Sequence, residues 1–314
     1  VALLFALLVV SALVVQWMLY LRRVDLGFDV PMLLTYTFDL PDDRYPTAET
    51  RAAFMRDLEA RLARLPGVSS AGLCSHVPAL DADVVRPLSG TLHDAVKPEE
   101  RPWASWFDVS PGFFPAAGIR VLAGRGFSAD DRAGSQPVAV LNRMAAERYF
   151  DDIGNAVRRT VTIHDAERGA QPVTIVGVVT GTKDSQVTRT SPQIYVPLDQ
   201  WPRASVTVLL RSDDPAGRAP DVHALMRTTD SMVAISELKT MSRIIEDELA
   251  SSRIINGLFA GFALLALALA AAGLFGVISY SVGQRRRELG IRLALGASPV
   301  LIGRMIVGEG LKIV

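Results

Sequence analysis

The chain has 314 residues, of which 49% are hydrophobic, and its 33 basic side chains balance its 33 acidic ones. The charge is unevenly placed: residues 285–314 carry six basic and two acidic side chains, Arg22 and Arg23 add two positive charges, and residues 24–284 are therefore net −6. An acidic central region argues against nucleic acid as a partner, because surfaces that bind nucleic acid are basic. The single cysteine, Cys74, excludes an intramolecular disulfide, so an apolar core must hold the fold.

An apolar run opens the chain and extends to Leu21. Trp17 and Tyr20 near its end suit a membrane headgroup boundary. A cleaved signal peptide is the alternative, but no basic region precedes the run and no convincing small-residue cleavage site is present. We therefore expect residues 1–23 to form a transmembrane helix whose start is missing from this sequence.

Residues 32–77 have the pattern of a β-α-β unit. The segment 32–40 is rich in β-forming residues and stops at Pro41. Thr47 or Thr50 is suited to cap a following helix, which repeats apolar residues at helical spacing until Pro66 and Gly67 end it. Residues 68–77 then predict a second strand.

A similar unit recurs at 204–235, with strands predicted at 204–210 and 233–235 and a short helix at 220–228. We expect the two units, 24–100 and 204–238, to form one split β-α-β sandwich, with residues 101–203 inserted as a mostly β subdomain. The predicted fold class is thus α+β, with two transmembrane helices flanking an extracytoplasmic domain.

Several features of this central region resemble chemical sites, but each has a simpler structural explanation. The four histidines are scattered without a second ligand at suitable spacing, so no metal site is expected. The aromatic residues from Trp103 to Phe114 could line a groove for a hydrophobic ligand, but core packing is the preferred interpretation. Gly124-Arg125-Gly126 predicts a turn and no phosphate-binding loop. We expect no catalytic residue, no cofactor and no enzymatic activity.

A long apolar segment follows at 254–284, where 31 successive residues include no charged side chain. A hydrocarbon core about 30 Å thick needs about 20 apolar residues, so this segment predicts a second transmembrane helix. Residues 239–253 should form a helical stalk that continues into it. Arg285, Arg286 and Arg287 follow directly and place this end in the cytoplasm, so residues 24–250 are expected to be extracytoplasmic. Within the segment, Gly257 and Gly261 form a Gly-x-x-x-Gly pair, and Gly273 and Gly276 extend a small-residue surface for helix packing.

Residues 285–298 predict a short amphipathic helix at the cytoplasmic surface, and residues 299–314 predict the start of a third membrane helix. One interpretation of the short helix is an interfacial anchor on membrane lipid. The other is a docking surface for a cytoplasmic protein. The residues assigned to that surface are Arg285, Arg286, Arg287, Glu288, Leu289, Gly290, Arg292 and Gly296.

The sequence resembles the MacB/FtsX-like permeases of ABC transporters. The block GLFGVISYSVGQRRRELGIRLALGAS at 273–298 is similar to the start of an FtsX-type permease domain. The segments VSPGFF at 109–114, GIRVLAGRGF at 118–127 and IYVP at 194–197, with shorter matches at 140–154, are similar to a MacB-type periplasmic core.

The resemblance implies a multi-pass protein of the bacterial inner membrane. A cytoplasmic ABC ATPase would act on residues 285–298, and the permease would pair with a second permease half or a second copy and drive export or release of a substrate. No Gly-x-x-x-x-Gly-Lys-Ser/Thr sequence occurs, so ATP would be hydrolysed outside these 314 residues.

Two other classes of function remain open at this stage. One is an FtsX-like signalling or scaffold protein that controls a periplasmic partner such as a cell-wall hydrolase. The other, a membrane-anchored enzyme, lacks a catalytic constellation.

Overall fold

The computed structural model describes residues 26–78, 84–92, 101–166, 169–183, 190–284 and 291. The chain forms two compact units, Val24–Asp247 and a second one that combines Val1–Arg23 with Glu248–Val314. The predicted transmembrane helix at 1–23 and the predicted third helix at 299–314 lie outside the described residues. No helix in the described part of the chain is both long enough and apolar enough to cross a membrane.

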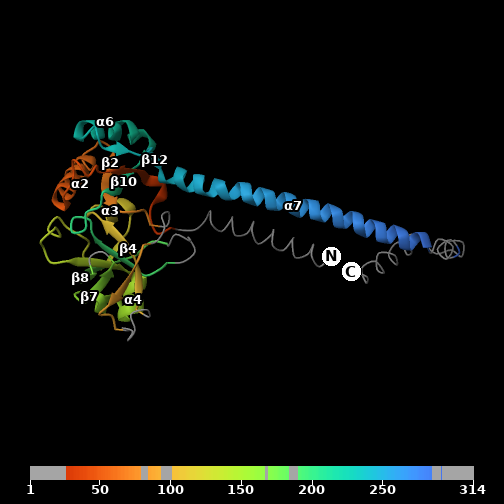
Figure 1. The fold of residues 1–314 in the computed structure, drawn as a ribbon, viewed down its shortest axis with the longest axis horizontal. Helices are drawn as coiled ribbons and strands as arrows, with labels where there is room; N and C mark the ends of the chain where they lie inside the picture. The colour runs from red at the N-terminus through yellow and green to blue at the C-terminus, as the bar shows by residue number, and fades with distance from the viewer. Residues whose placement is uncertain are drawn as a thin grey trace. The chain divides into compact units, whose positions relative to one another are not determined.

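The two predicted β-α-β units of the first compact unit form one layer (Figure 1). The first consists of β1 (Leu33–Asp39), α2 (Ala48–Leu62) and β2 (Val68–Cys74), and the second of β10 (Ser205–Ser212), α6 (Ala219–Thr229) and β11 (Ala234–Ile235). The strand order β11-β1-β10-β2 places β10 between the two strands of the first unit. This interleaving is the split β-α-β arrangement that the sequence predicts.

Helices α2 and α6 cover one face of this layer. Alternate strand residues are apolar and give the sheet an apolar face, which the two helices bury. Leu34, Tyr36 and Phe38 of β1 belong to the same buried cluster as Leu58 of α2 and Met226 of α6. Successive side chains of a strand point to opposite faces, so this spacing places all three β1 residues under the helices.

The opposite face of the layer is covered by α3 (Phe113–Ala117). Leu33 of β1 and Leu209 of β10 lie in this second cluster together with Phe113 and with Met241, the first residue of α7. A 3₁₀ turn at Val30–Met32 leads into β1, and β12 (Lys239–Thr240) pairs with β1 just before α7 begins.

The inserted region forms a closed ring of six strands. β4 (Trp103–Val109), β3 (Val85–Ser89), β7 (Thr160–Asp165), β8 (Gly169–Val179), β6 (Val138–Asn142) and β9 (Gln193–Pro197) pair in that order, and β9 pairs with β4 to close the ring. β5 (Val121–Gly124) pairs with β8 outside the ring. α4 (Arg143–Phe150) and α5 (Ile153–Ala156) contribute Ala145, Tyr149, Phe150 and Ala156 to the cluster that the ring strands share.

Two details differ from the organisation expected from sequence. β3 lies within residues 24–100, which were assigned to the split unit, yet it pairs with β4 and β7 of the ring. The ring is also hydrogen-bonded to the split layer, because Cys74 of β2 pairs with Val109 of β4 and makes one continuous sheet. The aromatic residues at 103–114 are mostly core, as preferred, since all but Trp103, which is 43% exposed, are buried.

Helix α7 runs from Met241 to Gln284, a length of 44 residues. It contains the predicted stalk and the predicted second span at 254–284, and the membrane location of that span stays a prediction. Gly257, Gly261, Gly273 and Gly276 lie on α7, and a Cβ atom at any of them would meet no heavy atom within 4 Å.

Candidate functional site

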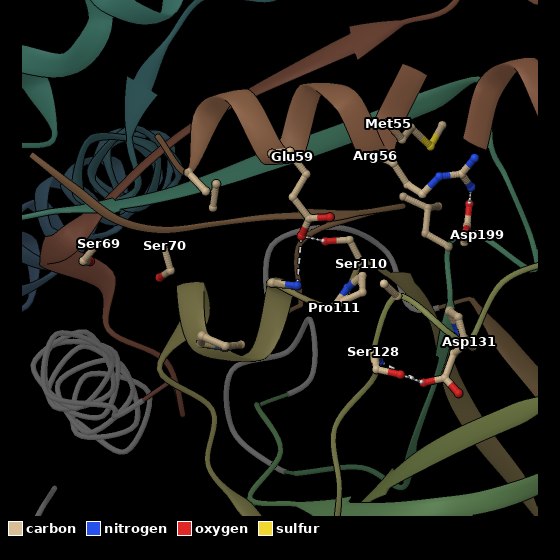
Figure 2. A pocket seen from close by; sticks show the side chains of 18 residues that line it. Met55, Arg56, Glu59, Ser69, Ser70, Ser110, Pro111, Ser128, Asp131 and Asp199 are labelled. Atoms are coloured by element: carbon tan, nitrogen blue, oxygen red, sulfur yellow. Dashed lines mark hydrogen bonds and ion pairs between the residues drawn. The ribbon is translucent and has the colours of Figure 1, made fainter. Parts of the chain in front are cut away.

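A pocket of about 460 Å³ opens in the first compact unit, where the split layer meets the ring (Figure 2). Its walls come from the second half of α2, the start of β2, residues 110–115, the loop at 128–131 and residues 197–199. Pockets of this size commonly hold small molecules, and this one combines apolar walls with a few polar groups.

Helix α2 supplies one wall of the pocket, because one stripe of its residues is buried under the sheet and the adjacent residues face the pocket. Thr47 and Thr50 form a reciprocal capping box that fixes the start of the helix. Leu58 and Leu62 are then fully buried under the sheet. Glu59 and Ala60 follow Leu58 along the helix and line the pocket beside this stripe.

Glu59 joins α2 to the segment that follows β4. Its Oε1 atom accepts hydrogen bonds from the Ser110 hydroxyl at 2.6 Å and from the Gly112 backbone N–H at 2.9 Å. The Ser110 hydroxyl also accepts a hydrogen bond from the Leu73 backbone N–H at 2.8 Å. Ser110 therefore links β2 to α2 through its side chain.

Glycine is required where this segment crosses β2. A Cβ atom at Gly112 would lie 2.5 Å from Oε1 of Glu59 and would overlap the carbonyl oxygen of Ala71. A Cβ atom at Gly72 would lie 2.5 Å from the backbone nitrogen of Phe113. The two backbones can thus approach closely only because both positions lack a side chain.

The electrostatic state of Glu59 reflects opposing effects. Burial raises the pKa of its carboxyl group, while the hydrogen bonds from Ser110 and Gly112 lower it and the nearby charge of Asp199 raises it again. Burial prevails and the pKa lies above its ordinary value.

Two ion pairs border the pocket. Arg56 of α2 pairs with Asp199, which is mostly buried beyond the end of β9. Arg125 forms a bidentate ion pair with Asp131, in which Nη1 donates to Oδ2 at 2.6 Å and Nη2 donates to Oδ1 at 2.8 Å. Burial raises the pKa of Asp131, but the hydrogen bonds from Arg125 and Ser128 and the charge of Arg125 outweigh it, so the pKa lies below its ordinary value.

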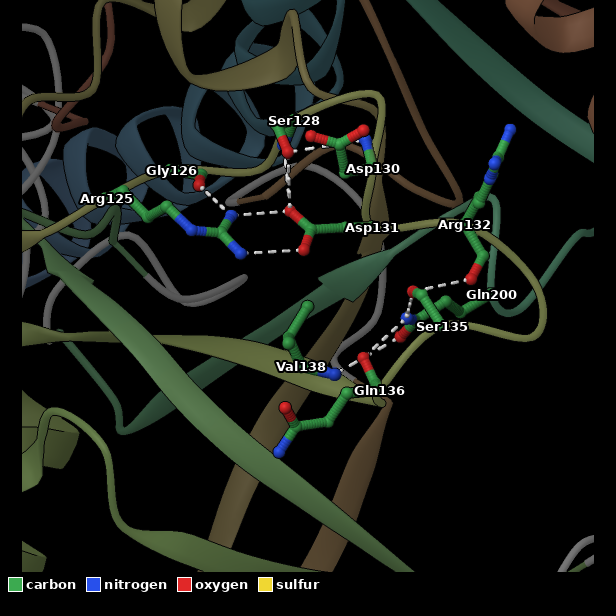
Figure 3. A network of polar contacts seen from close by, with 10 residues as sticks. All are labelled: Arg125, Gly126, Ser128, Asp130, Asp131, Arg132, Ser135, Gln136, Val138 and Gln200. Carbon is green, nitrogen blue, oxygen red and sulfur yellow. Dashed lines mark hydrogen bonds and ion pairs between the residues drawn. The ribbon is translucent and has the colours of Figure 1, made fainter.

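The Arg125–Asp131 pair belongs to a network that fixes the adjacent loop (Figure 3). The Ser128 backbone N–H donates to Oδ2 of Asp131 at 2.9 Å. Further along, the Gln200 side chain donates to the Ser135 hydroxyl at 3.0 Å and accepts from the Val138 backbone N–H at 3.2 Å. These contacts join residues 125–138 to one another and to Gln200 beside the pocket.

The arrangement is suited to binding. Within the described residues, no group of three or more histidine, cysteine, aspartate or glutamate side chains is placed to hold a metal ion. The Ser110 hydroxyl faces the Glu59 carboxylate, to which it donates at 2.6 Å, and it also accepts from the Leu73 backbone N–H at 2.8 Å, so its contacts join α2 to β2. The expected absence of enzymatic activity stays a prediction.

The residues predicted from sequence to dock a cytoplasmic protein lie elsewhere. All eight residues, within 285–296, are outside the described part of the chain. The four packing glycines lie on α7 and contribute nothing to the pocket. Their roles stay predictions.

The sequence analysis missed the pocket and its central residue, Glu59. The sequence signal for this pocket was weak. It consisted of Glu59 beside the buried stripe of α2 and of the Ser110-Pro111-Gly112 sequence directly after a predicted β region. Only the packing of α2 on residues 110–112, which are about 50 positions away in the sequence, brings these signals together.

Comparison with protein families gives two matches. Residues 33–221 match the MacB-like periplasmic core domain, and residues 260–314 match the FtsX-like permease C-terminal domain. The first match includes every residue of the pocket.

Individual relatives agree with these matches. The macrolide export ATP-binding/permease protein MacB of Chromobacterium violaceum is 27% identical over 202 residues, which cover 62% of this chain and 30% of that protein. The probable syringafactin export ATP-binding/permease protein SyfD of Pseudomonas syringae pv. syringae is 23% identical over 214 residues, which cover 65% and 32% respectively. The chain thus spans about a third of the length of these relatives.

The crystal structure of the periplasmic region of MacB from Actinobacillus actinomycetemcomitans is 16% identical, with coverage of 70% of this chain and 94% of that one and a TM-score of 0.44.

Proposed function

The chain belongs to the MacB/FtsX-like permease family, and on that premise we propose that it is a permease part of an ABC transporter that transmits ATP-driven motion to an extracytoplasmic domain. The observation that carries this proposal is the order of the two family matches. A periplasmic core match at 33–221 precedes a permease match at 260–314, and the unbroken helix α7 joins them.

In this proposal, residues 1–23 and 254–284 cross the bacterial inner membrane, and residues 24–250 lie on its outer side. The uncharged sequence of the second segment and the three arginines at 285–287 support this orientation. The glycines of α7 would pack against a second permease half or a second copy of the chain.

Residues 285–298 would receive the motion of a cytoplasmic ATPase. The sequence contains no phosphate-binding Gly-x-x-x-x-Gly-Lys-Ser/Thr motif, so we place ATP hydrolysis outside these residues. The names of the relatives, which describe export ATP-binding/permease proteins, support an export role. Helix α7 would carry the motion outward, because a continuous helix transmits displacement along its axis.

A photo-crosslinking experiment tests this proposal. A crosslinking amino acid is placed at Leu289 in the intact protein in its native membrane, and a matched control is placed at Ala133, an exposed residue of the 128–135 loop. We expect Leu289 to capture an ABC-type ATPase and Ala133 to capture none. Robust expression without ATPase capture from Leu289 would contradict the proposal and favour an anchored scaffold.

Charge reversal tests the coupling step itself. Arg286→Glu should abolish stimulation of ATP hydrolysis by the permease, because a docking surface depends on charge complementarity. Arg132→Glu, which reverses an exposed arginine of the first compact unit, should leave that stimulation unchanged. Equal ATPase stimulation in Arg286→Glu and the original protein would remove the basis for the coupling role.

A further inference from the structure

The charges around the pocket are balanced except at one residue. Arg56, Glu59, Asp131 and Asp199 are the charged residues that line it. Arg56 is paired with Asp199, and Asp131 is paired with Arg125. Glu59 accepts hydrogen bonds from two neutral groups, and the described residues offer it no ion pair. Among the described residues, Glu59 is therefore the lining charge without a counterion.

The geometry of Glu59 leaves one carboxylate oxygen available. Both hydrogen bonds from described residues reach Oε1, and Figure 2 shows both of them on the same carboxylate oxygen, so no described donor is bonded to Oε2. The two donors hold the carboxylate in a fixed orientation, so a ligand that pairs with Oε2 need not order the side chain itself.

Much of the remaining pocket wall is apolar. It includes Met55, Ala60 and Ala63 of α2 together with Pro111, Pro115 and Leu198. A partly buried carboxylate without a counterion is costly, and exposed apolar walls are costly as well. One ligand relieves both costs if it combines a positive charge with an apolar body.

We propose that this pocket binds a small cationic amphiphile, with one protonated amine paired to Glu59 and an apolar body against the α2 and proline walls. An anion would meet the uncompensated charge of Glu59, since the other two acidic lining residues, Asp131 and Asp199, are paired with arginines. A neutral ligand would leave the Glu59 charge uncompensated. The volume of about 460 Å³ suits a ligand of small-molecule size.

A fluorescence titration tests this assignment on the full chain in lipid nanodiscs. The probe is monodansylcadaverine, which carries one primary amine and an apolar fluorophore that brightens in apolar surroundings. The matched probe is its N-acetylated form, which is neutral and nearly the same in shape. We expect the amine probe to bind saturably and at least tenfold more tightly than the acetylated probe. The acetylated probe cannot form a charge-assisted hydrogen bond with Glu59.

Two substitutions locate the site. Glu59→Gln keeps an oxygen that accepts from Ser110 and Gly112 but removes the charge, and it should remove the tenfold preference for the amine. Ala60→Trp should fill the pocket and abolish saturable binding of both probes. Ala53→Trp is the matched control, because Ala53 is an exposed residue of the same helix outside the pocket, and it should bind like the original protein.

The outcomes are decisive even if Glu59→Gln fails to fold, because the comparison of the two probes and the Ala60→Trp variant need no change at Glu59. Equal affinity of the original protein for both probes would overturn the role of the charge. Saturable binding that survives Ala60→Trp would overturn the location. The assay measures binding without an ATPase, so its result is independent of the proposed coupling at residues 285–298.

Discussion

Gly112→Ala tests the closest backbone approach in the candidate site. Gly112 has φ −79° and ψ −6°, a conformation that alanine adopts without strain. On backbone grounds alone the substitution should stabilise the fold by about 0.4–1 kcal/mol, because alanine restricts the unfolded chain. The surroundings oppose this gain, since the new Cβ atom would lie 2.5 Å from Oε1 of Glu59 and overlap the Ala71 carbonyl oxygen.

The opposing cost is larger. Overpacking of this kind costs about 1–3 kcal/mol, and the Ala71 carbonyl is a backbone atom that cannot rotate away. Moving the segment would also weaken the hydrogen bonds of Glu59 to Ser110 and Gly112, each worth about 1.5 kcal/mol or more for a charged acceptor. We expect a net loss of about 3 kcal/mol, which lowers the ratio of folded to unfolded protein about a hundredfold.

Urea unfolding of the full chain in detergent measures this loss. Tryptophan fluorescence reports on the ring, because Trp106 and Trp201 are buried and pack edge to face with centroids 5.8 Å apart. Gly126→Ala is the control, since a Cβ atom there has its nearest neighbour, Phe114 Cδ2, at 3.6 Å. The control should change stability by less than about 0.5 kcal/mol. If Gly112→Ala unfolded at the same urea concentration as the control, the steric argument would be wrong.

Three further predictions concern the elements around the pocket, all measured by the same unfolding assay. Leu58→Ala should cost about 3 kcal/mol, because Leu58 is fully buried between α2 and the sheet; a loss below 1 kcal/mol would contradict its core position. Thr47→Ala should cost about 1 kcal/mol through loss of the capping box with Thr50, and an unchanged midpoint would mean that the cap adds nothing. Arg125→Met should lower the free energy of unfolding at pH 7. The difference in unfolding free energy from the original protein should shrink as the pH falls below about 4, because the Asp131 pKa is lowered in the folded state and protonation of Asp131 removes the ion pair. A difference that stayed constant down to pH 2 would argue against that pair as the cause.

The strands and helices of the split layer could be predicted from sequence because their signals are local. The predicted strand at 32–40 corresponds to β1, and the helix predicted after Thr47 corresponds to α2, capped by Thr47 itself. The helix predicted to extend to Pro66 ends at Leu62, and Leu65 packs against the same cluster from beyond the helix. The end of a helix depends on capping and tertiary contacts, and the spacing of apolar residues does not reveal these.

The insert was harder to predict. Its mostly β character was predicted, and residues 101–203 contain the strands β4 to β9. The helix α4 was not foreseen, although Asn142 caps it by accepting a hydrogen bond from the Ala145 backbone N–H. The closure of the ring through the parallel pairing of β4 with β9 joins residues almost 90 positions apart, so no local pattern could indicate it.

The order of the parts could be inferred from sequence alone: an acidic α+β region lies between apolar segments, and the arginines at 285–287 follow within a block that resembles a permease. Charge, hydropathy and periodicity are properties of neighbouring residues, so they are present before the chain folds. The contact of Glu59 of α2 with Ser110 and Gly112, and its position in the wall of a pocket, arise only in the tertiary structure. A pocket depends on which distant backbones approach closely, and here two glycines, Gly72 and Gly112, permit that approach between segments about 40 positions apart in the sequence.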